Sequence, residues 1–372
     1  MMPDAHRPDE HMGLSERELP VGINDGSSET TPLDETARRR PTAHDVARLA
    51  GVSQSAVSRT FTPGASVSDD TRERVHTAAK TLGYRPNLIA RSLIMRRSNI
   101  VGVAVPDLAN PFYPSVLQAL SGALTASGYR ILLFTAHASG SSDPILEEVL
   151  RYRLDALILV SASLSSGFAD ECRQIGLPVV LLNRTTARPT VSSVTGDNHA
   201  GACAIARFLL AGAHCRYAFV AGLESSSTSH DREIAFTATL AAAGQGLAAR
   251  EVANFAFDDA QRATRALLRA PTPPDAIFCA NDYMAIAALT TARDEFGMTP
   301  GVDVSIVGFD DIQLADAFAL TTYRQPARQM AERAVAIIDA QLRDAGQAAV
   351  QEIVPGTLTI RGSARLPPQG LA

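Results

Sequence analysis

The sequence predicts a chain of two unlike parts: an all-α headpiece built on a helix-turn-helix, and a larger α/β region of parallel sheets flanked by helices. Three observations lead to this prediction. Two short amphipathic helical patterns flank a glycine within residues 41–62. The segment around them is strongly basic, although the whole chain carries a net charge of −5. From residue 99 onward, short β-branched runs alternate with helical patterns at a spacing typical of parallel sheets.

Composition limits the class of protein. A hydrophobic content of 46% with 20% charged residues fits a globular protein with a large core, and 372 residues are too many for one ordinary domain. No run reaches the roughly 18 apolar residues of a transmembrane helix, and the N-terminus lacks the apolar stretch of a signal peptide. Four cysteines without a C-x-x-C pair indicate reduced thiols. We therefore expect a cytoplasmic chain with no membrane contact, no metal site and no cofactor.

Charge is divided unevenly along the chain. Residues 1–37 hold nine acids and two arginines, whereas residues 38–98 hold twelve Arg or Lys and four acids. Residues 1–40 also show little apolar periodicity, so we interpret them as a disordered extension. A basic block of about 60 residues inside an acidic protein is typical of a nucleic-acid-binding module. A merely solvated charged surface is the alternative.

The helix-turn-helix is the most specific local pattern. Gly51 falls where a tight turn needs a positive φ, and Ser53 suits the N-cap of the second helix. The predicted buried faces consist of Val46, Leu49 and Ala50 in the first helix and of Ala56, Val57 and Phe61 in the second. Gln54, Ser55 and Arg59 are left on the polar face of the second helix, which in this motif reads DNA.

A third helix and a linker complete the basic block. A helix is predicted over residues 69–82, between a capping serine and a terminating glycine. Pro86 then breaks the chain, and residues 88–94 have the length of two helical turns, which are marginal alone and form only on a partner. Leu93 beside arginines has the chemistry of a minor-groove wedge, in which an apolar side chain opens a base step. An ordinary linker is the alternative.

The α/β region is predicted to alternate between strands and helices. We expect strands at residues 99–105, 130–134, 156–160, 178–182, 192–196, 217–221, 275–279 and 304–308. We expect helices near residues 114–127, 143–152, 166–175, 198–212, 229–244, 259–269, 283–296 and 327–343. About 270 residues exceed what one such sheet usually takes, so two packed lobes are predicted.

Polar and aromatic residues follow several predicted strands. Ligands of open α/β sheets bind at the carboxyl ends of strands, which nominates the residues that come directly after them. These are Phe112 within 107–113, Asn183, Arg184, the loop 222–232, Asp282, Asp310 and Asp311. With Phe255, they have the side chains to line one polar site for a polyhydroxylated or small anionic ligand. Strand-end capping or turn chemistry is the alternative for each residue taken singly.

These residues and motifs give the chain a family resemblance: it resembles the lac-repressor/galactose-repressor (LacI/GalR) family of bacterial transcription regulators. The resemblance runs from about residue 41 to residue 366. It rests on DVARLAGVSQSAVSR (45–59), VSDDTRERV (67–75), LGYRPNLIARSL (82–93), VAVPDLANPFY (103–113), CANDYMAIAAL (279–289) and VSIVGFDDI (304–312). It implies a homodimer, or a tetramer of dimers, on a pseudo-palindromic operator in double-stranded DNA. It also implies a repressor whose operator affinity depends on a small polar effector, such as a sugar, bound between the two lobes of a periplasmic-binding-protein-like domain.

The resemblance also assigns residues. It implies DNA contacts by Thr42, Ser53, Gln54, Ser55, Ser58, Arg59, Asn87, Ala90, Arg91 and Leu93, the last as the wedge of a hinge helix. It implies effector contacts by Phe112, Asn183, Arg184, Thr228, Arg232, Phe255, Asp282 and Asp311. Two features depart from the family pattern. Thr62 and Pro63 follow the recognition helix where many members have Asn-Gly, and the N-terminal extension is atypical.

These inferences divide the chain into five parts. They are a disordered extension (1–40), the headpiece (41–85), a hinge helix or linker (86–98), an effector-binding and dimerisation domain (99–366) and a tail (367–372). Lobe 1 is expected over about 99–196 and 323–345, and lobe 2 over about 197–322 and 346–366, with crossovers near 196, 322 and 346. The tail is short and has no heptads, which favours a dimer over a tetramer.

Other functions stay open from the sequence. The α/β region alone suits a solute-binding protein, against which the headpiece and the missing signal peptide count. Ser229, His230 and Asp231 have the residue types of a hydrolase, but they are neighbours in one segment without a nucleophile elbow. No catalytic residue and no enzyme activity are therefore assigned. Among regulators, the effector either weakens operator binding or, in a corepressor-dependent or activating regulator, strengthens it.

Overall fold

The fold is described from a computed structural model of the chain. It describes residues 40–366 except 63, 87–96, 107, 136–148, 150, 162–165, 186–189 and 345. The chain divides into two compact units, Met1–Pro86 and Asn87–Ala372, and each is considered by itself. The predicted extension, most of the predicted hinge, the tail and most of the helix expected near 143–152 lie outside the described residues.

The described residues of the first unit form three helices, α1 (Ala43–Ala50), α2 (Gln54–Thr60) and α3 (Asp69–Leu82). Thr42 begins α1 with a capping box: its hydroxyl accepts from Asp45 N, while the Asp45 carboxylate accepts from Thr42 N. Gly51 ends α1 at φ 64°, in the left-handed region that glycine favours, so the chain turns sharply into α2. The predicted helix-turn-helix is confirmed.

A small apolar core holds these helices together. It consists of Val46, Ala47, Ala50, Val57, Val75, Ala78 and Ala79, with Phe61, Leu82 and Tyr84 partly buried against it. The predicted buried face of α1 is wrong at Leu49, which is 53% exposed. Ala47 is buried instead, because α1 packs a stripe of Val46, Ala47 and Ala50 against its neighbours and Leu49 falls outside this narrow stripe.

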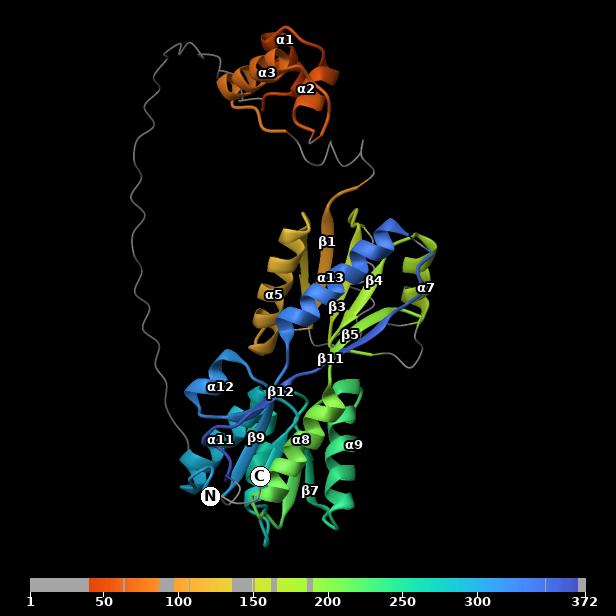
Figure 1. The fold of residues 1–372 in the computed structure, drawn as a ribbon. Helices are drawn as coiled ribbons and strands as arrows, with labels where there is room; N and C mark the ends of the chain where they lie inside the picture. Colours follow the sequence, from red (N-terminus) through yellow and green to blue (C-terminus); the bar gives the residue numbers. More distant parts are fainter. Residues whose placement is uncertain are drawn as a thin grey trace, which may run out of the picture. The chain divides into compact units, whose positions relative to one another are not determined.

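The second unit contains two six-stranded sheets, one in each lobe (Figure 1). The lobe 1 sheet has the order β11-β5-β4-β3-β1-β2, with β1 (Ile100–Val105), β2 (Arg130–Thr135), β3 (Ala156–Val160), β4 (Val179–Leu182), β5 (Ser192–Gly196) and β11 (Gln351–Val354). The lobe 2 sheet has the order β12-β10-β9-β8-β6-β7, with β6 (Tyr217–Ala221), β7 (Leu247–Val252), β8 (Ala276–Cys279), β9 (Ser305–Asp310), β10 (Thr321–Arg324) and β12 (Thr357–Thr359). Neighbouring strands are parallel apart from the antiparallel pair β10 and β12.

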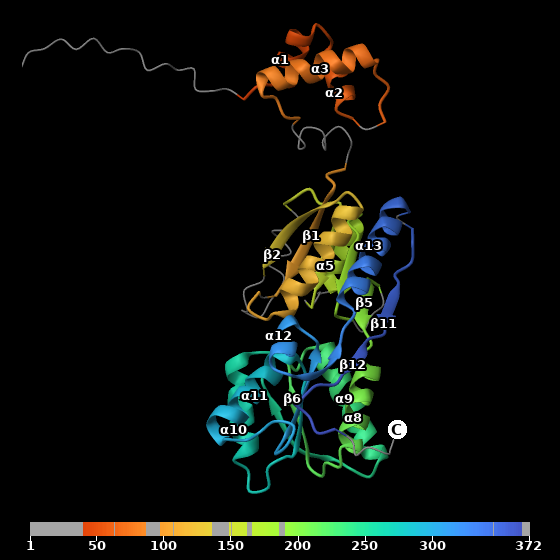
Figure 2. The ribbon, with the colours of Figure 1, turned by 60° about the vertical axis from the view of Figure 1, so that its left-hand side comes forward.

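Helices cover both faces of each sheet. In lobe 1, α5 (Phe112–Ala126) and α13 (Ala327–Arg343) pack together on one face, and α7 (Ser166–Gln174) lies on the other. In lobe 2, α8 (Asn198–Ala211) pairs with α9 (Ser227–Ala242) on one side of the sheet, and α10 (Phe257–Leu268) pairs with α11 (Asp282–Phe296) on the other (Figure 2).

Burial explains why the strands read as continuous apolar runs. All five residues of β3 are buried, with Ile158 in the core under α5 and α13 and Leu157 in the core under α7. Strands covered on both faces need apolar side chains at every position, which is the pattern that predicted parallel sheets. The predicted α/β fold class is confirmed. Among the described residues, no helix is both long and apolar enough to cross a membrane.

The chain passes between the lobes three times: after β5, after β10 and after β11. The expected third crossover near residue 346 is wrong. Because β11 pairs in parallel with β5, the chain stays in lobe 1 until residue 354 and crosses at Pro355 and Gly356. The second crossing also moves, from 322 to just after Arg324, because β10 pairs with β9 over its whole length.

The sequence patterns do not predict β7, β10, β11, β12 or the short helix α12 (Gln313–Ala317). Three of the four strands have only three or four residues, and β7 is a partly exposed edge strand with the sequence LAAREV. Strands of this kind are stabilised by the sheet edge that they meet, so their own residues carry a weak signal.

Candidate functional site

The exposed face of α2 is the candidate DNA interface. Gln54, Ser55, Ser58 and Arg59 are exposed on it, whereas Val57 points into the headpiece core. This face presents an amide, two hydroxyls and a guanidinium, which are groups that read base edges in the major groove. The structure therefore brings together the four α2 residues expected to contact DNA.

Thr42 and Ser53 cap helices. Their hydroxyls accept hydrogen bonds from Asp45 N (3.3 Å) and Ala56 N (3.2 Å), which satisfies free N–H groups at the starts of α1 and α2. Their positions follow from capping alone, so a phosphate contact at either residue stays a prediction. The other expected DNA contacts, Asn87, Ala90, Arg91 and Leu93, lie outside the described residues.

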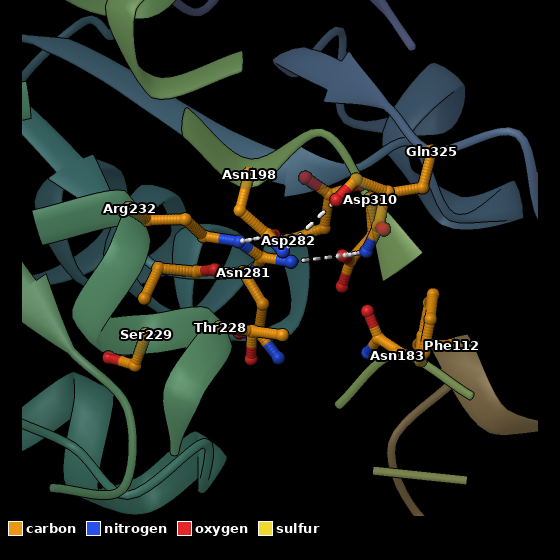
Figure 3. A network of polar contacts seen from close by, with 12 residues as sticks. Phe112, Asn183, Asn198, Thr228, Ser229, Arg232, Asn281, Asp282, Asp310 and Gln325 are labelled. Atoms are coloured by element: carbon orange, nitrogen blue, oxygen red, sulfur yellow. Dashed lines mark hydrogen bonds and ion pairs between the residues drawn. The ribbon is translucent and has the colours of Figure 1, made fainter. Parts of the chain in front are cut away.

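The second candidate site surrounds Arg232, in the first turns of α9 (Figure 3). Arg232 is only 2% exposed. Its Nε donates to Asn198 Oδ1 (2.8 Å) and its Nη1 donates to Ala280 O. The guanidinium carbon lies 3.7 Å from the centre of the Phe309 ring, and Nη2 lies 3.6 Å from Asp310 Oδ1. The guanidinium is thus held on every side by protein groups, and burial lowers its pKa against the opposing effect of nearby carboxylates.

Two buried carboxylates lie near this guanidinium. Asp282 begins α11 and accepts hydrogen bonds from Ile312 N (2.9 Å) and Thr322 Oγ1 (2.5 Å). Asp310 ends β9 and accepts from Gln325 Nε2 (2.7 Å). Desolvation raises the pKa of both carboxyls, and the charge of Asp310 raises the pKa of Asp282 further. The pair therefore favours keeping a proton.

The expected effector contact at Asp311 stays a prediction, and the structure shows two ion pairs of this residue. Its carboxylate pairs with Arg324 (Oδ2–Nε 2.6 Å) and with Arg361 (Oδ1–Nη1 2.8 Å), which ties β10 to the segment after β12. Asp310, one residue earlier, faces Arg232 instead. Successive residues at a strand end point to opposite sides, so only one of two adjacent aspartates can face the site. That residue is Asp310.

Lobe 1 contributes Asn183 and Arg184, which follow β4. Asn183 adopts φ 58° and its Nδ2 donates to Ser161 Oγ (3.0 Å). Arg184 Nη2 donates to Ser161 O (2.8 Å) in the same lobe, and Nη1 donates to Ser225 O (2.9 Å) in lobe 2. Arg184 is therefore a link between the lobes as well as an expected effector contact.

The other expected effector contacts come from helix starts and a loop. Thr228 is buried in the first turn of α9, with its hydroxyl 2.9 Å from Ser226 Oγ. Phe112 is buried at the start of α5. Phe255 packs so closely over Gly222 that a Cβ at this glycine would lie 2.1 Å from the ring, so any larger residue there would force the ring to move.

Asn198, Asp310 and Gln325 belong to this network but are not among the expected contacts. The strand-end rule points to both Asp310 and Asp311, but the family resemblance implies an effector contact only at Asp311. Asn198 stands two residues after β5, where the strand-end rule applies equally. Gln325 follows β10, a strand that the sequence does not predict, so no sequence signal points to it.

A helix-turn-helix headpiece joined to a two-lobed α/β domain with polar residues buried between its lobes defines a ligand-controlled DNA-binding protein. Residues 42–87 match the family model described as bacterial regulatory proteins, lacI family, and residues 206–364 match that of a periplasmic binding protein-like domain. The chain belongs to the lacI family and is a sequence-specific DNA-binding regulator of transcription.

Named relatives place it among repressors and regulators. The chain is 32% identical over 304 residues to the HTH-type transcriptional regulator CelR of Thermobifida fusca, covering 79% of this chain and 89% of that protein. It is 29% identical over 332 residues to the HTH-type transcriptional repressor CytR of Escherichia coli strain K12, covering 88% and 97%. Among solved structures, the lac repressor dimer bound to operator and the anti-inducer ONPF is similar with a TM-score of 0.80 and 26% identity, covering 88% of this chain and all of that one.

Proposed function

We propose that this regulator is a repressor whose operator affinity changes when a small polar ligand, a sugar or a related metabolite, occupies the site around Arg232. The observation that carries the proposal is the convergence of buried polar side chains from both lobes on that site (Figure 3): Asn183 from lobe 1, and Thr228, Arg232, Asp282 and Asp310 from lobe 2. Buried polar groups need hydrogen-bonding partners, and a few convergent polar groups in a site between lobes suit a polar ligand.

Each side chain has a role that its chemistry supports. Phe112 and Phe255 offer ring faces to the apolar side of a sugar ring. Asn183, Thr228 and Asp310 offer hydrogen-bonding groups for hydroxyls. Arg232 holds Asn198 and Asp310 in position, and Asp282 adds a second buried carboxylate beside them. Ligand binding then favours one arrangement of the lobes, and the lobe arrangement governs the hinge that precedes residue 97.

DNA binding is proposed to use two grooves. Gln54, Ser55 and Arg59 read base edges in the major groove, while Thr42, Ser53 and Ser58 contact phosphates. Asn87, Ala90 and Arg91 support Leu93 as a wedge in the minor groove. We further propose that the protein acts as a cytoplasmic homodimer on a pseudo-palindromic operator, in line with the dimer seen for the lac repressor.

The test begins without a known operator. Full-length protein would select binding sites from random duplexes about 30 base pairs long, which suffice for two half-sites one helical turn apart. A pseudo-palindrome is expected; enriched sites without two-fold symmetry would contradict the dimer. A thermal-shift screen of sugars, sugar acids and nucleosides then identifies ligands, whose effect on operator binding is measured by fluorescence anisotropy.

Site variants complete the test. Phe112→Ala and Thr228→Ala are expected to weaken binding of any ligand found, because each removes a proposed contact. Arg173→Ala is a matched control, since that exposed arginine pairs with Asp170 on its own helix α7. Equal ligand affinity in all three variants and the wild type would place the effector elsewhere.

A further inference from the structure

The strongest unexplained feature near the proposed effector site is the position of Arg184. Its guanidinium is buried, with the residue only 7% exposed, yet its partners are backbone carbonyls from two different lobes. Nη2 donates to Ser161 O after β3 in lobe 1, and Nη1 donates to Ser225 O after β6 in lobe 2. A cation buried at this depth with no carboxylate partner in the described part of the chain is unusual, and burial lowers its pKa.

A second hydrogen bond crosses between the lobes beside the first. Thr185 N donates to Ser227 Oγ (3.3 Å), at the start of α9. Two consecutive residues of lobe 1 thus hold two residues of the same lobe 2 loop, 225–227. The helix that begins there carries both Thr228 and Arg232, so the link joins lobe 1 directly to the element that bears the proposed effector contacts.

The two contacts join lobe 1 to the N-terminal end of α9. This helix packs against α8, which begins directly after the crossover that follows β5. Separating the lobes would break both hydrogen bonds. The pair of contacts therefore opposes separation of the lobes.

One nitrogen of the Arg184 guanidinium has no acceptor among the described residues. Among the described residues, its Nε is a buried donor without a hydrogen-bond partner, while both Nη atoms are occupied. Any hydrogen bond at Nε must be donated by Arg184, because a guanidinium has donors and no acceptor. An acceptor oxygen on a bound molecule is the natural partner for this group, and accepting from it would fix the guanidinium on its two carbonyls.

We propose that Arg184 is a positioning residue whose hydrogen bonds link the two lobes, and that an effector oxygen stabilises this link by accepting a hydrogen bond from Nε. This role rests on the proposed function, in which the arrangement of the lobes controls DNA binding. It differs from an ordinary ligand contact, because Arg184 also donates to backbone carbonyls of both lobes.

Amide hydrogen exchange of the full-length protein without added ligand tests the link between the lobes. In Arg184→Ala, the amides of residues 183–185 and 222–230 are expected to exchange about tenfold faster, because the variant loses the one charge-assisted hydrogen bond of Arg184 that crosses between the lobes. Arg184→Lys keeps the charge and can still donate to one or both carbonyls, so it should restore much of the protection. Arg173→Ala serves as the matched control in the same lobe, with exchange of both segments unchanged.

Ser227→Ala is a second test of the link that does not depend on the folding of the arginine variants. It removes only the second contact, and a smaller acceleration in the same two segments is expected. Unchanged exchange in both Arg184→Ala and Ser227→Ala, with wild-type melting temperatures, would overturn the proposal. The experiment needs neither operator nor effector, so a negative result would leave the proposed repressor function untouched. If the wild type instead failed to select an operator, that result would refute the repressor function and not the link between the lobes.

Discussion

Arg232 and Asp310 form a buried ion pair, with Nη2 and Oδ1 3.6 Å apart and both side chains almost fully enclosed. The pair is not isolated, because Asp282 contributes a second carboxylate and Gln325 donates to Asp310. This arrangement places buried charges of lobe 2 at the proposed effector site.

Arg232→Ala should abolish the response to effector and also destabilise the protein. Removal of the guanidinium leaves Asp310 without its cation, and breaking a buried pair in this way costs about 3–5 kcal/mol. Urea denaturation of the variant measures the loss. Arg265→Ala is the control, because that exposed arginine pairs with Glu295 at the surface and should matter little. Equal effects of the two substitutions would argue against a central role for Arg232.

Asp282→Asn should flatten the dependence of stability on pH. Burial and Asp310 raise the pKa of Asp282 to about 8, well above the ordinary value of an aspartate. Between about pH 4 and 8 the folded state then holds a proton that the unfolded state has lost, so wild-type stability falls as pH rises, by at most about 1.4 kcal/mol per pH unit. The asparagine can still accept from Ile312 N and donate to Thr322 Oγ1, so its fold is preserved.

Urea midpoints measured at pH 5, 6, 7 and 8 check this prediction. The wild type should lose stability across this range more steeply than Asp282→Asn. Parallel curves for the two proteins would mean that Asp282 is ionised throughout.

Asp311→Ala should lower stability without changing ligand affinity. The substitution removes the ion pairs with Arg324 and Arg361, and hydrogen bonds to charged groups of this kind contribute about 2–3 kcal/mol. Isothermal titration with a ligand from the screen gives the affinity, and Asp310→Ala is the contrasting variant. A large loss of affinity in Asp311→Ala alone would restore that residue to the effector site.

Arg59→Ala should weaken binding to the selected operator by about 1–3 kcal/mol, because a bidentate contact to guanine is lost. Binding to random DNA should change much less. Arg74→Ala, on α3 and paired with Asp70, is the control for the loss of one positive charge. The same loss on operator and random DNA would show that Arg59 contacts phosphate only.

Leu93→Ala should reduce the preference for operator over random DNA, since the wedge that opens the central base step is removed. Affinity for both DNAs, measured at one salt concentration, gives the ratio. An unchanged ratio would favour an ordinary linker in this segment.

Much of the fold follows from local pattern. The turn at Gly51, the caps at Thr42, Ser53 and Ser68, and the apolar run of β3 are each determined by neighbouring residues. Such signals depend on backbone conformation and on side-chain periodicity, which a single segment displays without its partners.

The site was only partly predictable. The strand-end rule nominated Asn183, Arg184, Asp282 and Asp310, since parallel strands end at one edge of a sheet. It did not separate Asp310 from Asp311, because both follow β9 and only packing decides which of them faces Arg232. It also missed Gln325, whose place depends on the pairing of β10.

The sequence by itself therefore determined the class of fold, the helix-turn-helix and its reading face, since these depend on contacts between residues close in the chain. Only the tertiary structure decided that β11 returns to lobe 1, that Asp311 pairs with arginines, and that Arg184 links the two lobes. Those features arise from hydrogen bonds and ion pairs between segments far apart in the sequence, and the residues involved carry no local signal of their distant partners.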